Sequence, residues 1–364
     1  MKIQELIQLL DEWVPPSYAE DFDNVGLLVG NDKNECNGIL IALDTTEEII
    51  EEAIAKKCNV ILSFHPIIFS GLKKLTGRTY VEKVVLKAIE NKISIIALHT
   101  RLDNHPKGMN DIIAKRLELT NTEVLIQKKE TLKKLVAYVP ENHVENVLES
   151  LHQAGAGNLD NYSECSFQLE GIGKFKGSNK SNPFTGNKLE KVTVKEIQIN
   201  VVFESHLLSN IQKSLVESHP YETVAYEIYS LINSYSKIGM GCLGDLKKQM
   251  DSLSFLKFVK KQMKTEVIRY SKISNKKIRK VAVLGGSGSF AIEDAKRKGA
   301  DAFVTSDLKY HQFFQAENQL LLVDIGHYES EKFIKKYIYN YLTKKIPNFA
   351  IVLSSIITNP VNYL

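Results

Sequence analysis

The stretch Leu320 to Glu331, LLLVDIGHYESE, decides both the fold class and the candidate site. Leu320 to Val323 is a short, unbroken apolar run, which is typical of a strand buried on both faces of a parallel sheet. His327 and Glu331 follow four residues apart, so a helix beginning near His327 would place both side chains on one face. Ligands of open α/β proteins bind just beyond the carboxyl ends of such strands. Taken by itself, the stretch also fits a plain surface helix turn.

Length and composition indicate an ordinary globular protein. The 364 residues favour two domains, and 43% are hydrophobic and 25% charged. The net charge of +4, from 47 basic and 43 acidic residues, does not favour nucleic-acid binding. No apolar stretch approaches membrane-spanning length, and the N-terminus lacks a signal-peptide pattern. The cysteines, which have no paired spacing, indicate reduced thiols in a cytoplasmic protein; they are Cys36, Cys58, Cys165 and Cys242.

Residues 1–127 alternate strand and helix patterns, which predicts β-α-β crossovers and a parallel sheet. The predicted strands are Ile39–Leu43, Val60–Leu62, Ile93–Leu98 and Val124–Ile126. The predicted helices between them are 47–57, 80–91 and 110–117. From about residue 234 the same style returns, with strands predicted at Val267–Arg269, Val281–Leu284, Ala302–Thr305, Leu320–Val323 and Ala350–Leu353.

Residues 128–233 follow a different order, β-α-β-β-α-β, which is the ferredoxin-like arrangement. Its predicted elements are Leu135–Val139, Val144–Gln153, Ser163–Leu169, Val194–Phe203, Leu207–Glu217 and Glu222–Leu231, with a loop over Gly171–Asn187. The fold class is therefore α/β. A discontinuous α/β domain (1–127 and 234–364) with a largely parallel sheet carries an inserted ferredoxin-like α+β domain (128–233).

Several other predicted strands end in residues that could bind a metal. His65 follows one strand, and Asp103 lies in the loop beyond another. With His327 and Glu331 they form a mixed histidine–carboxylate set, which suits Zn²⁺, Mn²⁺ or Fe²⁺. Each residue has a structural alternative: His65 as a core histidine before Pro66, and Asp103 as an Asx-turn former.

Two further strand ends carry side chains capable of acid–base chemistry. Asp44 ends the strand Ile39–Leu43, and His99 follows the strand Ile93–Leu98. The alternative for Asp44 is a helix N-cap. The run VAVLGGSGSF, residues 281–290, could hold a phosphate on its backbone N–H groups, but it lacks the Lys-Ser/Thr of a P-loop. A tight strand-to-helix turn beside the metal site is the favoured interpretation.

These stretches resemble the NIF-three-like dinuclear metal-centre family, whose bacterial members are often named GTP cyclohydrolase I type 2 homologs. The similarity runs nearly end to end and rests on the following segments: Ala19–Leu28, His65–Phe69, His99–Asp103, Leu284–Gly288, Thr305–Asp307 and His327–Glu331. Gly171–Phe175 and His219–Thr223 are similar to segments of the PII-like insert of the longer members.

The resemblance implies a two-metal site in a toroidal homohexamer. By matching positions, Asp103 would bind one metal, His65 and His327 the other, and Glu331 would bridge them. Where the family usually has two consecutive histidines, this chain has Phe64 and His65. The missing imidazole belongs to the metal that also takes Asp103. We therefore expect one well-held ion, with Zn²⁺ as the first candidate, and a second that is labile or absent.

Two functions follow as expectations. The first is a metal-dependent hydrolase of a nucleotide-like small molecule, resembling GTP cyclohydrolase, with acid–base help from His99 or Asp44. The second is a non-catalytic ring that binds a metal or small effector and serves a regulatory or scaffold role. DNA binding through a ring comes last, because the charge balance does not favour it.

Overall fold

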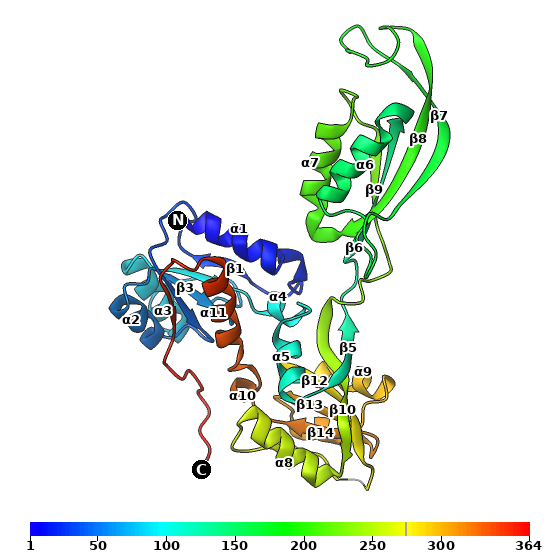
Figure 1. The fold of residues 1–364 in the computed structure, drawn as a ribbon. Coiled ribbons are helices and arrows are strands. Elements are labelled where there is room, and N and C mark those ends of the chain that lie inside the picture. Colours follow the sequence, from blue (N-terminus) through cyan, green and yellow to red (C-terminus); the bar gives the residue numbers. More distant parts are fainter. Residues whose placement is uncertain (274) are drawn as a thin grey trace. The chain divides into compact units, whose positions relative to one another are not determined.

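The computed structural model describes residues 1–273 and 275–364. The chain forms two compact units (Figure 1). The first, here the core unit, comprises Met1–Gln127 and Ser236–Leu364, and the second, here the insert, comprises Lys128–Tyr235. Among the described residues, no helix has the length and apolar character needed to cross a membrane.

The helices of the core unit are α1 (Ile3–Trp13), α2 (Glu47–Ala55), α3 (Tyr80–Glu90), α4 (Thr100–Asp103), α5 (Met109–Arg116), α8 (Ser252–Met263), α9 (Ile292–Arg297), α10 (His327–Glu331) and α11 (Ile334–Lys345). The insert contains α6 (Val144–Gln153) and α7 (Leu208–Ser218). Short 3₁₀ turns are η1 (Pro16–Tyr18), η2 (Glu141–His143), η3 (Ser205–Leu207), η4 (Ser289–Ala291) and η5 (Tyr310–Ala316).

The first sheet of the core unit has the order β1-β4-β3-β2-β15. Its strands are β1 (Gly26–Val29), β2 (Ile39–Ala42), β3 (Val60–Ser63), β4 (Ser94–Ala97) and β15 (Ile351–Leu353). Strands β4, β3, β2 and β15 are parallel, and β1 is antiparallel to β4. Every residue of β2, β3 and β4 is buried, as the unbroken apolar runs predicted. Thr46 and Thr79 cap α2 and α3 by accepting backbone N–H bonds.

The second sheet has the order β11-β14-β13-β12-β10-β5. Its strands are β5 (Thr120–Gln127), β10 (Gly239–Met250), β11 (Arg269–Tyr270), β12 (Ile278–Ser287), β13 (Ala302–Ser306) and β14 (Leu321–Asp324). Strands β12, β13 and β14 are parallel, whereas β10 pairs antiparallel with both β12 and β5.

The sheet and the pairing partner predicted for one strand were wrong. Val124–Ile126 was predicted to extend the parallel sheet of residues 1–127, but it belongs to β5 at the antiparallel edge of the second sheet. Its partner β10 lies more than a hundred residues along the chain and was not predicted. Local patterning shows that a strand exists, but it does not select a partner across an inserted domain.

One of the hydrophobic clusters of the core unit joins its two sheets. Ile41, Leu62 and Ile96 from the first sheet share one buried cluster with Val283 and Val323 from the second. The carboxyl ends of parallel strands from both sheets are thereby fixed within one unit.

The insert has the predicted ferredoxin-like topology. Its strands are β6 (Leu132–Pro140), β7 (Ser166–Lys176), β8 (Lys191–Glu204) and β9 (Tyr226–Ser230), in the antiparallel order β7-β8-β6-β9. Helices α6 and α7 lie side by side over its separate core, joined by Ser150 and Ser214 (Figure 1). The predicted loop over Gly171–Asn187 begins too early, because β7 continues through both of its glycines to Lys176.

Candidate metal centre

The candidate metal centre lies where strands of both sheets end. Asp44 and His65 follow β2 and β3 of the first sheet, and His327 begins α10 just after β14 of the second. Gly326 connects β14 to α10 with a φ of 88°, a backbone conformation that glycine adopts without steric cost. The prediction that a helix begins near His327 is confirmed.

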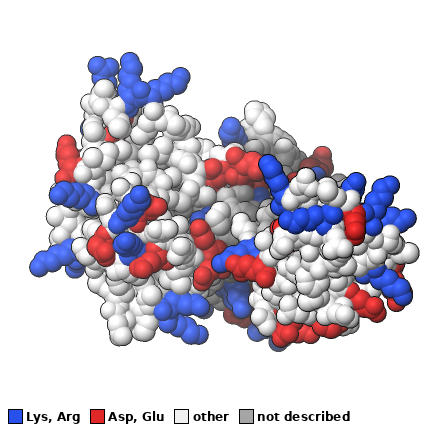
Figure 2. Space-filling view, turned by 90° about the horizontal axis from the view of Figure 1, so that it is seen from above, with Lys and Arg blue, Asp and Glu red and all other residues white. Residues whose placement is uncertain are grey.

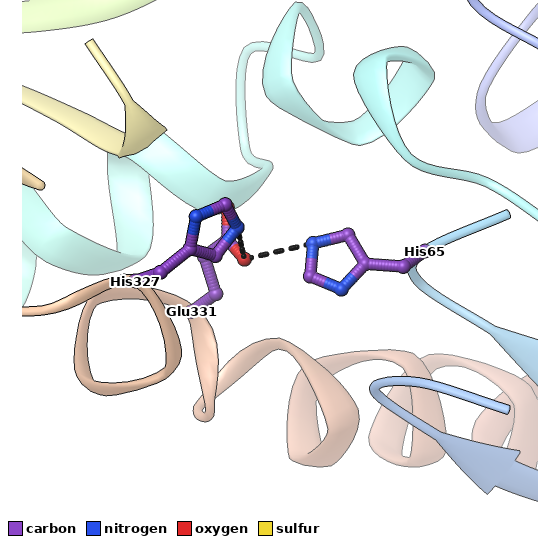
Figure 3. Close-up of side chains that lie close together, drawn as sticks. All are labelled: His65, His327 and Glu331. Carbon is purple, nitrogen blue, oxygen red and sulfur yellow. Dashed lines mark ion pairs between the residues drawn. The ribbon is translucent and has the colours of Figure 1, made fainter. Parts of the chain in front are cut away.

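Three ligating atoms converge at this point. Figure 3 shows the imidazoles of His65 and His327 on either side of the Glu331 carboxylate. Glu331 Oε2 lies 3.0 Å from His65 Nε2 and 3.2 Å from His327 Nε2. One ligating atom from each of the three residues lies within 4.8 Å of the other two. Two imidazoles and a carboxylate form a donor set that suits a borderline divalent ion.

Each histidine of the centre presents its other ring nitrogen to a carboxylate. His65 Nδ1 lies 2.7 Å from Asp44 Oδ1, and His327 Nδ1 lies 2.6 Å from Asp307 Oδ2. A carboxylate at Nδ1 holds the proton there and leaves the Nε2 lone pair directed at the centre. These are the carboxylate–histidine pairs found behind many metal ligands.

Charge coupling within the cluster shifts the pKa values strongly. Burial lowers the pKa of His65, but the negative charges of Glu331 and Asp44 outweigh it and raise the pKa to about 10. Burial likewise lowers the pKa of His327, but Asp307 and Glu331 outweigh it and raise the pKa to about 11. Burial raises the pKa of Glu331, and the two histidines bring it down to about 2. Without a metal, the three side chains therefore hold one another in charged forms, and a bound metal would replace the protons on the two Nε2 atoms.

Asp103 lies at the end of α4 and is electrostatically coupled to this cluster. Burial and the negative charge of Glu331 raise its pKa well above the usual range. Among the residues that the structure describes, the buried Asp103 Oδ1 has no hydrogen-bond partner, and His65 Nε2 and Glu331 Oε2 contact each other at 3.0 Å without hydrogen-bond geometry. Buried polar atoms are rarely left unsatisfied, and a cation is one of the partners that satisfies them. This donor set therefore fits a divalent metal.

The two candidate acid–base residues, Asp44 and His99, both line a cavity beside the centre. Asp44 also accepts a hydrogen bond from the Thr358 hydroxyl. His99 Nδ1 lies 2.7 Å from the buried Asp23, and its ring centroid lies 5.5 Å from that of His65. The backbone of His99 has a φ of 35°, which strains a non-glycine residue.

That cavity has a volume of about 680 Å³ and belongs to the core unit. Its wall combines aromatic rings with charged groups, among them Phe69, Tyr80, Arg269, Asp307, Glu329 and Tyr363. Arg269 lies between Asp324 and the Leu308 carbonyl oxygen, and its side chain remains 55% exposed. A cavity of this size accommodates a small molecule with a planar ring system.

The sequence patterns alone assign no role to Asp307 or Asp23. Asp307 follows β13, and Asp23 lies in a loop far from His99 along the chain. The signal for Asp307 was present, because a carboxylate directly after a parallel strand lies at the same edge as His65 and His327. No local pattern pairs Asp23 with His99.

The glycine-rich turn lies directly against Glu331. Gly286 has a φ of 66°, and a Cβ atom there would approach Glu331 Oε1 to 2.5 Å. Its N–H donates to Ser330 Oγ, and its carbonyl oxygen accepts from the hydroxyls of Thr305 and Ser306. The turn therefore supports the α10 carboxylate.

Comparisons with known proteins agree with this architecture. Residues 1–360 match the model of the Duf34/NIF3 (NGG1p interacting factor 3) family. A Staphylococcus epidermidis protein named GTP cyclohydrolase 1 type 2 homolog is 36% identical, with 100% of each chain covered. A Bacillus subtilis protein of the same name is 37% identical, with 99% of this chain and 98% of that one covered.

Solved structures give the same result. A Bacillus cereus protein related to NIF3 has a TM-score of 0.88 at 36% identity, covering 100% of this chain and 99% of its own. The Staphylococcus aureus protein SA1388 has a TM-score of 0.78 at 32% identity, with the same coverage.

Proposed function

The chain belongs to the Duf34/NIF3 family, and from this premise we propose that it is a metal-dependent hydrolase of a nucleotide-like small molecule. The observation that carries the proposal is the convergence of His65, His327 and Glu331 on one point beside a cavity. The name of the curated relatives, GTP cyclohydrolase 1 type 2 homolog, suggests GTP as the first substrate to test.

The metal would be held by His65, His327 and Glu331, and Zn²⁺ is the ion that this donor set suits best. Manganese and iron are the other candidates. The chemistry supplied by a bound divalent ion is Lewis acidity, which acidifies water and polarises the group under attack. Asp44 and Asp307 keep the Nδ1 protons in place, so both imidazoles point their lone pairs inward.

The cavity supports a nucleotide-like substrate. Phe69, Tyr80 and Tyr363 offer ring faces for a planar base. Arg269 offers a partly exposed guanidinium, the group that binds phosphate best. His99 lines the same cavity and is held by Asp23, which fits a role in proton transfer.

A second metal would have only Asp103 and the bridging Glu331 as protein ligands. Phe64 fills the place of the histidine that the family usually has, and its side chain is fully buried. Two carboxylates hold a borderline metal weakly. We therefore propose one tightly held ion and a second that is labile or absent.

The alternative is a non-catalytic, ring-shaped protein that binds a metal or an effector and has a regulatory or scaffold role. In that case the metal would stabilise the fold without turnover. The hexameric ring and the cytoplasmic location remain predictions in both cases. DNA binding remains last, because Lys and Arg side chains lie among Asp and Glu on the face shown in Figure 2, without forming a continuous basic patch.

The test is metal analysis of the purified protein beside His327→Ala, with GTP consumption measured on both. His311→Ala is the matched control, because His311 is an exposed histidine of the same unit that does not line the cavity. We expect about one ion per chain in the native protein and the control, and a loss of both metal and activity in His327→Ala.

The outcomes separate the two functions. Metal that is lost in His327→Ala, without GTP consumption by any of the three proteins, favours the binding role and removes GTP as substrate. Metal that is retained in His327→Ala at the native level contradicts the assignment of the centre itself.

A further inference from the structure

The insert has a cavity of its own, with a volume of about 730 Å³. It lies where β7 and β8 extend as a long hairpin (Figure 1). Residues of Gly171–Phe175 and of Tyr221–Thr223 line it, although these two segments are about fifty residues apart. None of its residues belongs to the metal centre or the cavity beside it. The cavity therefore needs an explanation separate from the proposed hydrolase.

Glu196 is held in this cavity by two features. Tyr221 donates its hydroxyl hydrogen to Glu196 Oε1 at 2.8 Å. Gly173 makes room for the same carboxylate on the neighbouring strand, since a Cβ atom there would lie 1.9 Å from Glu196 Oε2. Any other residue at position 173 would displace the Glu196 side chain. Gly173 in β7 therefore leaves the space that the Glu196 carboxylate occupies.

Tyr221 is itself held in place. His219 Nδ1 accepts a hydrogen bond from the Tyr221 N–H at 3.1 Å, and His219 Nε2 donates to the Tyr138 carbonyl oxygen at 3.0 Å. Burial and the contact with Glu196 raise the pKa of Tyr221, so the phenol stays protonated and remains a donor. Glu196 is therefore the acceptor in the pair.

Aromatic rings line the cavity that contains this carboxylate. The ring centroids of Phe175 and Phe184 lie 6.3 Å and 6.1 Å from that of Tyr221, and Tyr138 lines the same space. The loop that carries Phe184 is fastened by the Asn182 N–H, which donates to Glu222 Oε1 at 2.8 Å. Ring faces around a carboxylate form a site that attracts a cation on a flat body.

The charges of the cavity are not balanced within the insert. Glu170, Glu196 and Glu222 line it against a single cation, Lys174. Among the described side chains, no lysine, arginine or histidine forms an ion pair with Glu196. A partly buried carboxylate without a cationic partner is a binding group for a positively charged ligand.

We propose that this cavity binds a small organic cation, with an ammonium or guanidinium group against Glu196 and a flat apolar body among Tyr138, Phe175, Phe184 and Tyr221. The site is separate from the metal centre, so the proposal is compatible both with the metal-dependent hydrolase and with the non-catalytic ring. In either case, the ligand would give the insert an effector-binding role.

The experiment is calorimetric titration of the full chain with benzamidine, a flat cation, and with benzamide, its neutral counterpart. Glu196→Gln removes the charge and keeps the shape, and Tyr221→Phe removes only the hydrogen bond that fixes Glu196. Glu145→Gln, at an exposed glutamate of α6 outside the cavity, is the matched control. A titration after chelation of bound metal, and one of His327→Ala, separate this site from the metal centre.

We expect saturable benzamidine binding that weakens about tenfold in Glu196→Gln and for benzamide, as loss of a charge-assisted bond predicts. Tyr221→Phe should weaken binding by a smaller factor, and Glu145→Gln, His327→Ala and chelation should leave it unchanged. Absence of saturable binding, equal binding of benzamide, or native binding by Glu196→Gln would each overturn the proposal. If Glu196→Gln does not fold, the decisive variant is Tyr221→Phe, and native affinity for benzamidine in that variant would overturn the proposal.

Discussion

At the scale of single residues, the chain fixes its histidines through acids that lie far away in sequence. His65, His99 and His327 are each paired at Nδ1 with a carboxylate, from Asp44, Asp23 and Asp307 respectively. This pairing fixes ring orientation before any ligand binds, which reduces the ordering that binding requires. Asp44 and Asp307 follow strands β2 and β13, so these two carboxylates lie at the rigid edges of the two sheets.

Phe64 gives the first prediction. Its ring centroid lies 5.0 Å from that of His65 and 5.8 Å from that of His99. Phe64→His places an imidazole beside His65 and His99, at the position where the resemblance implies a second histidine. We expect bound metal to rise from about one to about two ions per chain. Without metal, the buried imidazole should destabilise the protein by about 1–3 kcal/mol, because its ring nitrogens lack partners.

Metal analysis and thermal unfolding, with and without added Zn²⁺, measure both effects. Phe64→Leu is the control, since it removes the ring without adding a ligand. A second ion already held tightly by the native protein, or none gained by Phe64→His, would contradict the account of the second site.

At the scale of structural elements, the glycine-rich end of β12 determines where α10 presents Glu331. In Gly286→Ala, the new methyl group must avoid Glu331 Oε1, and the backbone must keep a φ of 66° that alanine disfavours. We expect lower stability, by about 1–2 kcal/mol, and metal affinity reduced at least tenfold. Competition with a chromogenic chelator measures the affinity.

Gly299→Ala is the control for that change. Gly299 also has a positive φ, of 72°, but nothing lies within 4 Å of the position its Cβ would occupy. It should therefore share the loss of stability and keep the metal affinity. Equal metal loss in both variants would show that strain, and not the contact with Glu331, is responsible.

His219 links the stability of the insert to pH. Burial is the main cause that lowers its pKa, helped by His143, while Glu196 and the Tyr138 carbonyl oppose the shift. The unfolded chain therefore binds a proton at a higher pH than the folded chain. The stability contributed by the neutral ring is complete above the unfolded pKa of about 6.5 and is lost as the pH falls below it.

Urea unfolding of the insert, followed by the fluorescence of its tyrosines at about pH 8 and about pH 5, tests this. We expect the midpoint to fall with pH in the native protein and to fall less in His219→Gln, whose amide can still donate to Tyr138. His143→Gln serves as the control. A native midpoint that moves no more than that of His219→Gln would show that another group sets the pH dependence.

The sequence predicts what local periodicity and strand ends encode, and little beyond that. The strand before His327, the helix carrying His327 and Glu331, and the β-α-β-β-α-β order of the insert all follow from patterns of a few residues. The antiparallel β5–β10 pair and the contact of Asp23 with His99 do not, because their partners are separated by many residues. Gly171 and Gly173 were misleading for a related reason: their role in β7 depends on Glu196, a residue of another strand.

At the scale of the whole molecule, the insert lies between two strands of the core unit that a short loop could connect directly if the insert were removed. Strands β5 and β10 are antiparallel neighbours, and Gln127 pairs with Gly239 in their register. Direct fusion of Gln127 to Ser236 would turn these strands into a hairpin with the short loop Ser236–Ile238, a common hairpin length. The insert keeps its own hydrophobic core, so each unit has what it needs to fold alone.

We therefore expect a chain lacking Lys128–Tyr235 to fold, to bind about one metal ion per chain, and to gain thermal stability from Zn²⁺ as the full chain does. The isolated insert should fold cooperatively and show no such gain, because none of the candidate ligands lies in it. Circular dichroism, metal analysis and melting with and without Zn²⁺ measure these outcomes. If the shortened chain folds but fails to hold metal, the insert supports the centre directly. Zn²⁺ stabilisation of the isolated insert would instead place a metal site where the geometry of the described residues offers no ligand group.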